Sequence, residues 1–181
     1  YLMSGDKEYV CELILGQSTD TKDSYGMVTD KSDKVSVTRE ELNEVLKKFT
    51  GELIQIPPAY SAVKLHGKKL YEYARQNIQV EKQGRPINIK SIELLKFDGN
   101  KALLKVRCSK GTYIRTLCND IGKSLGTFGH MGILIRTESK GLHINNSVTL
   151  EKLKYLNDSN KLDECLIPVE SIYKLDKINV E

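Results

Sequence analysis

Residues 86–108 contain the feature that most constrains the fold, two β-rich runs separated by a short turn. INIKSIELLKF and KALLKVRC flank Asp98-Gly99-Asn100, a pattern typical of a β-hairpin. In the second run every second position is apolar, and these positions share one face: Ala102, Leu104, Val106 and Cys108. The sequence therefore predicts an antiparallel pair of strands with one buried face.

A predicted helix follows this hairpin. IRTLCNDIGKSLG has Leu117, Ile121 and Leu125 at four-residue spacing and ends at Gly126. Two other segments have clear periodicity. Residues 7–15 alternate as a strand does, and residues 38–49 read as a helix with a capping box formed by Thr38 and Glu41.

Weaker patterns complete the prediction. Residues 16–26 read as a loop, residues 70–77 as a short helix, and residues 130–144 as a segment containing a strand. Another helix is expected to begin after Thr149. The predicted fold class is α+β, with a mixed, mainly antiparallel sheet flanked by helices.

The junction between the hairpin and the following helix is a candidate binding site. Ser109-Lys110-Gly111-Thr112 lets backbone N–H groups converge at a helix start, where an anion is favoured. Lys110 could contact phosphate, Tyr113 offers a ring for stacking, and Arg115 could pair with a carboxylate or phosphate. An ordinary helix start with a surface ion pair explains the same residues, so both interpretations stay open.

Composition excludes several classes of protein. No apolar run approaches the roughly 20 residues of a membrane span. The cysteines are too widely spaced for a zinc site or a disulfide framework, and we expect reduced thiols in a cytoplasmic protein: Cys11, Cys108, Cys118 and Cys165. GxGxxG, GxxxxGK[ST], HExxH and GxSxG are absent, which argues against nucleotide-driven, zinc-dependent and α/β-hydrolase enzymes.

Charge is unevenly distributed along the chain. Residues 1–60 have a net charge of −4, whereas residues 60–90 and 105–140 each have a net charge of +5. In PPAYSAVKLHGKKLYEYAR basic residues alternate with tyrosines: Tyr60, Lys64, Lys68, Lys69, Tyr71, Tyr73 and Arg75. Rings that stack on bases and cations that meet phosphates suit RNA. An amphipathic helix whose tyrosines line a core would give the same pattern.

Five stretches taken in order resemble one family: KEYVCELILGQSTDTKDSYG, IPPAYSAVKLHGKKLYEYAR, RPINI, CSKGTYIRTLCNDIGKSLG and HMGILIRT. The chain resembles the bacterial tRNA pseudouridine synthase B (TruB) family from about residue 6 to residue 169. The resemblance implies the catalytic-domain fold of that family and an isomerase that converts the T-loop uridine of tRNA, position 55 in standard tRNA numbering, to pseudouridine. It also implies a cytoplasmic monomer that binds the T-arm stem-loop and needs no metal or cofactor. The target base would be extruded into a pocket.

The resemblance implies roles for individual residues. Tyr9 would stack on the target base and take part in catalysis, Tyr113 would lie against the target nucleotide, and Leu134 would form an apolar wall. Arg115 would pair with the catalytic aspartate. Charge and position add candidates for phosphate contact: Lys64, Lys68, Lys69, Lys110 and Arg136.

The sequence departs from the family at one motif. The catalytic aspartate of the family lies in Gly-x-Leu-Asp-Pro, which is absent here, and neither Asp20 nor Asp23 is assigned its role. We expect an inactive fragment in which Arg115 has lost its partner and the sheet has an exposed edge. Residues 1–165 would be the central and C-terminal part of a catalytic domain, and 166–181 the start of an extension or linker. The alternative is a non-catalytic RNA-binding or RNA-chaperone module.

Overall fold

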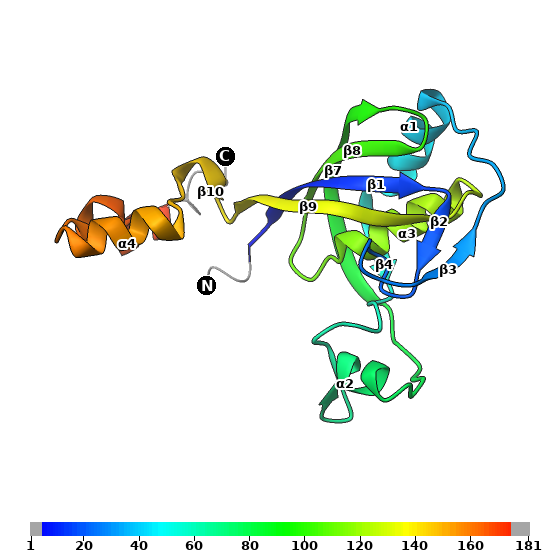
Figure 1. Ribbon diagram of the computed structural model, residues 1–181, viewed down its shortest axis with the longest axis horizontal. Coiled ribbons are helices and arrows are strands. Elements are labelled where there is room, and N and C mark those ends of the chain that lie inside the picture. The colour runs from blue at the N-terminus through cyan, green and yellow to red at the C-terminus, as the bar shows by residue number, and fades with distance from the viewer. Residues whose placement is uncertain (1–4, 175–181) are drawn as a thin grey trace.

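A six-stranded antiparallel sheet forms the body of the protein (Figure 1). The structure, a computed structural model, describes residues 5–174. The strand order is β10-β9-β1-β8-β7-β4, and all five neighbouring pairs are antiparallel. The strands are β1 (Lys7–Leu15), β4 (Gly51–Gln55), β7 (Arg85–Phe97), β8 (Lys101–Cys108), β9 (Gly129–Ser139) and β10 (Leu142–His143). The predicted fold class and the hairpin of β7 and β8 are confirmed.

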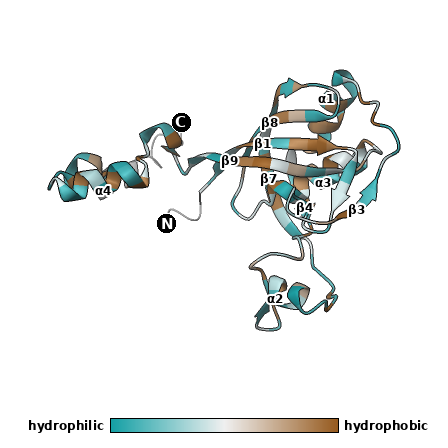
Figure 2. Cartoon of the chain, in the orientation of Figure 1, coloured by the Kyte–Doolittle hydropathy of each residue, from teal (hydrophilic) through white to brown (hydrophobic). Residues whose placement is uncertain are grey.

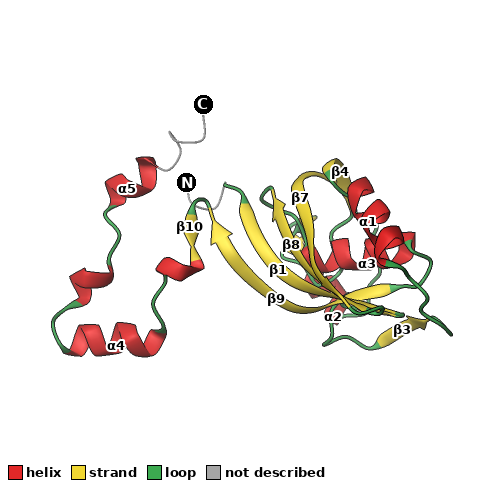
Figure 3. Cartoon of the chain, turned by 90° about the horizontal axis from the view of Figure 1, so that it is seen from above, coloured by secondary structure: helices red, strands yellow, loops and turns green. Residues whose placement is uncertain are grey.

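Two helices cover one face of this sheet, α1 (Arg39–Lys48) and α3 (Ile114–Ser124) (Figure 3). The predicted capping box of Thr38 and Glu41 begins α1. Figure 2 shows hydrophobic residues along the strands and helices of the body. The core is built from the faces that the sequence periodicity predicts: Cys11, Leu13, Leu42, Leu46, Ala102, Leu104, Val106, Cys108, Leu117 and Ile121. Burial of these side chains is the main source of the stability of the fold.

Residues 56–84, which we call the projecting segment, extend away from the sheet (Figure 1). They contain a small hairpin of β5 (Lys64–Leu65) and β6 (Lys68–Lys69), followed by α2 (Leu70–Arg75). Pro57 and Pro58 precede the hairpin and keep helix out of that part of the chain. The short helix expected here is confirmed.

The short helix η2 (Ile144–Asn146) directly follows β10 and contacts β9. The helices after it lie apart from the body of the sheet (Figures 1 and 3). They are α4 (Leu150–Asp158), η3 (Leu162–Cys165) and α5 (Val169–Lys174). Thr149 caps α4 as predicted. Part of the extension expected over 166–181 lies outside the described residues, and the boundary at residue 165 stays a prediction. Within residues 5–174, no helix is long and apolar enough to span a membrane.

Among the strands that were not predicted are β2, β3 and β4. The expected loop over 16–26 begins with β2 (Gln17–Thr19), which pairs with β3 (Val28–Lys31), and β4 forms one edge of the sheet. All three have at most five residues, too few to show a period. In the described part of the chain, residues 132–137 of β9 have β1 on one side and no strand on the other, so the exposed edge expected from the sequence is present.

Candidate functional site

Arg115 forms the main ionic contact of the candidate site. It lies in the first turn of α3, and its Nη1 donates to the Oδ2 atom of Asp23 at 3.2 Å. Only 21% of the Arg115 side chain and 15% of the Asp23 side chain are exposed. Little water reaches this pair, so the two charges attract each other more strongly than an exposed pair would.

Hydrogen bonds hold the Asp23 carboxylate in place. Its Oδ1 accepts a bond from the Thr21 hydroxyl at 2.7 Å and one from the Tyr25 backbone N–H at 3.1 Å. The loop is fastened to β9, because the Ser24 N–H donates to the Met131 carbonyl at 2.9 Å. The position of the carboxylate is therefore set both by its own loop and by the sheet.

Arg115 also holds the start of the projecting segment, since its Nη2 donates to the backbone carbonyl of Tyr60. Beside it, the side-chain amide of Gln55 accepts a bond from the Tyr113 N–H at 2.8 Å and donates to the Tyr113 carbonyl at 3.1 Å. Tyr113 caps α3, and the N–H groups at a helix start have no partner inside the helix. The buried Gln55, at the end of β4, supplies one and thereby fixes where α3 begins.

Tyr9 and Arg136 lie opposite each other on β1 and β9, and Cys11 lies opposite Leu134. Burial raises the pKa of the Tyr9 phenol above its ordinary value, and the nearby Cys108 raises it further. The Arg136 guanidinium partly offsets that rise, because it favours the phenolate. Leu134 is 41% exposed. The register thus brings Tyr9, Arg136 and Leu134 to one region of the sheet.

The other predicted phosphate contacts lie elsewhere. Lys64 and Lys69 are opposite each other in the β5–β6 hairpin, next to Lys68, in the projecting segment. Lys110 is exposed in the turn after β8. These lysines therefore do not lie with Arg136 on the sheet. They place positive charge on the projecting segment and on the turn after β8.

A cavity of about 530 Å³ lies between the turn after β2 and the projecting segment. Asp20 lines it from the turn, and Tyr60, Lys82 and part of α2 line it from the other side. Arg115 donates to the Tyr60 carbonyl, so the ion pair stands next to this cavity. The volume is within the range of small-ligand pockets.

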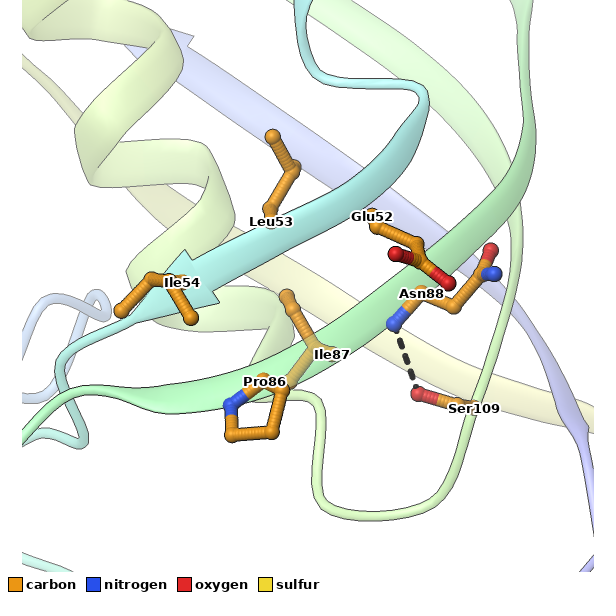
Figure 4. A pocket seen from close by; sticks show the side chains of 7 residues that line it. All are labelled: Glu52, Leu53, Ile54, Pro86, Ile87, Asn88 and Ser109. Carbon is orange, nitrogen blue, oxygen red and sulfur yellow. Dashed lines mark hydrogen bonds between the residues drawn. The ribbon is translucent and has the colours of Figure 1, made fainter.

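A second cavity, of about 500 Å³, lies beside β4 and β7 (Figure 4). Its lining is largely apolar, with Leu53, Ile54 and Pro86, and the Asn88 N–H donates to the Ser109 hydroxyl at 2.9 Å. Glu52 is the one titratable residue among those that line it. Among the described residues, no hydrogen bond joins the Glu52 carboxylate to the Ser109 hydroxyl, and we assign this cavity no chemistry.

Asp23 is a carboxylate partner of Arg115 that the sequence reasoning did not identify. The expected pairing of Arg115 with the aspartate of the absent motif stays a prediction. Asp23 follows a buried strand in a turn rich in Gly, Ser and Thr, which was the signal that could have identified it. Gln55 and the Tyr60 carbonyl were also missed, since a long-range amide contact and a backbone acceptor leave no pattern in the sequence.

Two protein-family models match consecutive parts of the chain. A family model described as "TruB family pseudouridylate synthase (N terminal domain)" matches residues 1–114. Another, described as "tRNA pseudouridylate synthase B C-terminal domain", matches residues 115–174. The two matches meet without a gap, at the Tyr113–Arg115 junction described above.

Curated relatives named tRNA pseudouridine synthase B are similar along nearly all of the chain. The Pelotomaculum thermopropionicum protein is 43% identical over 175 residues, which cover 94% of this chain and 55% of that protein. The Clostridioides difficile protein is 41% identical, with 98% and 59% covered, and the Clostridium tetani protein is 43% identical, with 100% and 62% covered. The chain thus spans less than two thirds of the length of these relatives.

Solved structures share the fold. The crystal structure of a Cbf5-Nop10-Gar1 complex matches with a TM-score of 0.69 and 26% identity, over 96% of this chain and 44% of that one. The archaeal box H/ACA sRNP Nop10-Cbf5 complex matches with a TM-score of 0.58 and 25% identity, over 90% of this chain and 39% of that one. With both family models matching in order and relatives above 40% identity, the chain belongs to the TruB family of pseudouridylate synthases.

Proposed function

We propose that this protein isomerises the T-loop uridine of tRNA, position 55 in standard tRNA numbering, to pseudouridine. Family membership and the names of the curated relatives support this activity. The structural observation that supports it best is the partly buried Arg115–Asp23 pair beside a cavity of about 530 Å³. We further propose that the protein is a cytoplasmic monomer that binds the T-arm stem-loop and works without metal or cofactor.

In the proposed reaction the bond from the ribose to uracil N1 breaks, the base turns, and C5 bonds to the same ribose carbon. The hydrogen on C5 is released as a proton and N1 gains one, so no oxidant or reductant is needed. The ring of Tyr9 stacks on the extruded base, Tyr113 lies against the nucleotide, and Leu134 walls the pocket. Aromatic and apolar walls keep the detached base in place until it rejoins.

In this proposal Arg115 holds the catalytic aspartate of the Gly-x-Leu-Asp-Pro motif in position. Asp23 holds Arg115 through their ion pair and does not attack the substrate. Both oxygens of Asp23 are engaged, Oδ2 by Arg115 and Oδ1 by Thr21 and Tyr25. The Gly-x-Leu-Asp-Pro motif is absent from these 181 residues. We therefore propose that this stretch alone is inactive.

The test is tritium release from a T-arm stem-loop that contains 5-tritiated uridine, with the full-length gene product as enzyme. We expect release from the target uridine, and loss of turnover but not of RNA binding in Arg115→Ala. Arg107→Ala is the control, since Arg107 is partly exposed on β8 and pairs with Glu138. Tight binding without release from the unaltered protein would instead indicate an RNA-binding module. Normal turnover in Arg115→Ala would refute the role of this residue.

Stacking by Tyr9 has a separate test. Tyr9→Leu keeps an apolar side chain but removes the ring, so binding of the target base should weaken by about 1–3 kcal/mol. Unchanged kinetics in this variant would exclude stacking by Tyr9 as a source of affinity.

A further inference from the structure

Gln55 lies where the projecting segment leaves the sheet. It is the last residue of β4 and pairs with Arg85, the first residue of β7. This pairing fixes the backbone of Gln55, and the residue as a whole is 6% exposed. A buried amide is costly unless its oxygen and its nitrogen both find hydrogen-bond partners. The side chain of Gln55 therefore extends from a fixed strand end and needs partners inside the protein.

Both ends of the Gln55 amide bond to the backbone of one residue, Tyr113. Its Oε1 accepts a bond from the Tyr113 N–H at 2.8 Å, and its Nε2 donates to the Tyr113 carbonyl at 3.1 Å. The same carbonyl accepts a bond from the Leu117 N–H, inside α3, at 3.1 Å. The N–H and the carbonyl lie on either side of the Cα atom of Tyr113. Bonds to both groups therefore fix the direction in which the tyrosine side chain leaves the backbone.

The residues near Tyr113 in sequence do not supply this support. Tyr113 is the N-cap of α3, and its side chain makes no capping bond. In a capping box, a Glu or Gln at the third helical position bonds to the N–H of the N-cap residue. That position is Thr116 here, and within the described residues its buried hydroxyl has no hydrogen-bond partner. Gln55 thus makes, from a distant strand, the bond that a capping box would make locally.

A second contact joins the same two parts of the chain. Arg115 donates through Nη2 to the Tyr60 carbonyl, five positions after Gln55. Arg115 is also held by its ion pair with Asp23. In the part of the chain that the structure describes, no side chain other than Gln55 bonds to the Tyr113 backbone. Loss of the Gln55 amide should therefore release Tyr113, whereas Arg115 keeps both of its partners.

We propose that Gln55 is a positioning residue for the reaction, which holds Tyr113 so that its ring lies against the target nucleotide. The inference rests on the proposed function. A catalytic geometry is sensitive to small shifts, since a displacement of about 1 Å can lower the rate about 100-fold. Gln55 does not touch the substrate in this role, and it affects turnover through Tyr113.

The experiment measures tritium release and stem-loop binding by the full-length gene product that carries Gln55→Leu. Leucine has a similar size and makes neither bond to Tyr113. We expect kcat to fall by about 10- to 100-fold. The Kd of the stem-loop should stay the same, because phosphate contacts supply a large share of the affinity for RNA. Gln55→Glu retains the acceptor for the Tyr113 N–H, so its kcat should be intermediate, and it carries the test if Gln55→Leu does not fold.

Gly122→Ala is the control for a loss of stability. Gly122 lies near the other end of α3, and an added Cβ atom would meet backbone atoms of Phe128 and Gly129. This variant and Gln55→Leu are expected to lose stability to a similar extent, but only Gln55→Leu alters the contacts of Tyr113. Gly122→Ala should therefore keep the kcat of the unaltered protein.

Tyr113→Leu separates positioning from a purely structural role. This substitution removes the ring and keeps the backbone groups that bond to Gln55. Adding Gln55→Leu should therefore lower the urea midpoint as much as it does in the protein that retains Tyr113. The effect on kcat should be different, because without the ring Gln55→Leu should lower kcat little further. Full additivity of the two losses of kcat would overturn the role of Gln55.

The outcomes for Gln55 and for the proposed activity are distinct. An unchanged kcat in Gln55→Leu, in an enzyme that releases tritium, would overturn the positioning role and leave the activity standing. Equal losses of kcat in Gln55→Leu and Gly122→Ala would do the same. An unaltered protein that releases no tritium would overturn the activity and, with it, the role of Gln55.

Discussion

The guanidinium of Arg115 lies 3.2 Å from the carboxylate of Asp23, although 92 positions separate the two residues in the chain. The pair joins α3 to the turn after β2, and both side chains are mostly buried. Asp23→Asn keeps the shape of the side chain but leaves a buried guanidinium without its counter-charge. We expect unfolding to become easier by roughly 3 kcal/mol, measured by urea denaturation.

Two controls make this prediction specific. Asp20→Asn changes a carboxylate in the same turn that bonds to backbone N–H groups and not to Arg115, and an amide oxygen can still accept those bonds. Asp20→Asn should lower the free energy of unfolding far less than Asp23→Asn does. A double-mutant cycle with Arg115→Met should show strong coupling between Arg115 and Asp23, and additive effects would contradict the pair.

Gln55 should contribute more to stability than most surface-strand glutamines. Its amide bonds both the N–H and the carbonyl of Tyr113, and it is 6% exposed. Gln55→Leu has a similar size but leaves two backbone groups without partners, at a cost of about 2–3 kcal/mol in urea denaturation. Gln55→Glu retains an acceptor for the Tyr113 N–H, so its stability should lie between that of Gln55→Leu and that of the unaltered protein. Equal stabilities of Gln55→Leu and the unaltered protein would show that water replaces the amide.

Gly122 is expected to tolerate no side chain. A Cβ atom there would lie 2.4 Å from backbone atoms of Phe128 and Gly129, where α3 crosses the start of β9. Gly122→Ala should therefore lower stability by about 1–3 kcal/mol, although alanine favours helices more than glycine does. Ser124→Ala, an exposed position in the same helix, is the control and should be neutral or slightly stabilising. The measurement is the thermal midpoint of each variant.

The buried thiol of Cys108 should make the folded protein less stable at alkaline pH. Burial raises the pKa of its thiol from 9.0 to about 11, so the folded state keeps the thiol protonated where the unfolded chain would ionise it. The stabilisation is complete below about pH 9 and is lost as pH rises through 11, by about 3 kcal/mol at most. Cys108→Ala should remove this part of the pH dependence.

The comparison of the two proteins over pH isolates the thiol from other titrating groups. Burial also shifts the pKa of Lys22, and in the opposite direction, so the unaltered protein alone would give a mixed profile. The difference between the unfolding free energies of Cys108→Ala and the unaltered protein should change between pH 9 and 11. A constant difference would mean that the thiol does not titrate as proposed.

The sequence predicted those parts of the fold whose residues repeat at a regular spacing. The alternation in β8 and the capping box at Thr38 were sufficient because each depends on neighbouring residues. Short β4 could not be recognised, because its five residues become a strand through pairing with β7. Local patterns report local structure, and edge strands depend on contacts made elsewhere in the chain.

The candidate site was predicted in the same uneven way. Tyr113 and Arg115 were singled out because a strand–turn–helix junction has a recognisable sequence pattern. Asp23, Gln55 and the Tyr60 carbonyl were not found, since each acts through a contact over more than 50 positions of sequence. The resemblance to a family implies roles for side chains, which stay predictions, and the structure shows which contacts these residues make.

Arg115 contacts two segments that are far apart in the sequence, the turn that carries Asp23 and the start of the projecting segment at Tyr60. These two segments form opposite sides of the same cavity. Because one guanidinium orders both, much of the conformational entropy of these segments is already lost when the protein folds. Less conformational entropy is then lost when a ligand enters, so a larger part of the interaction energy with that ligand contributes to its affinity.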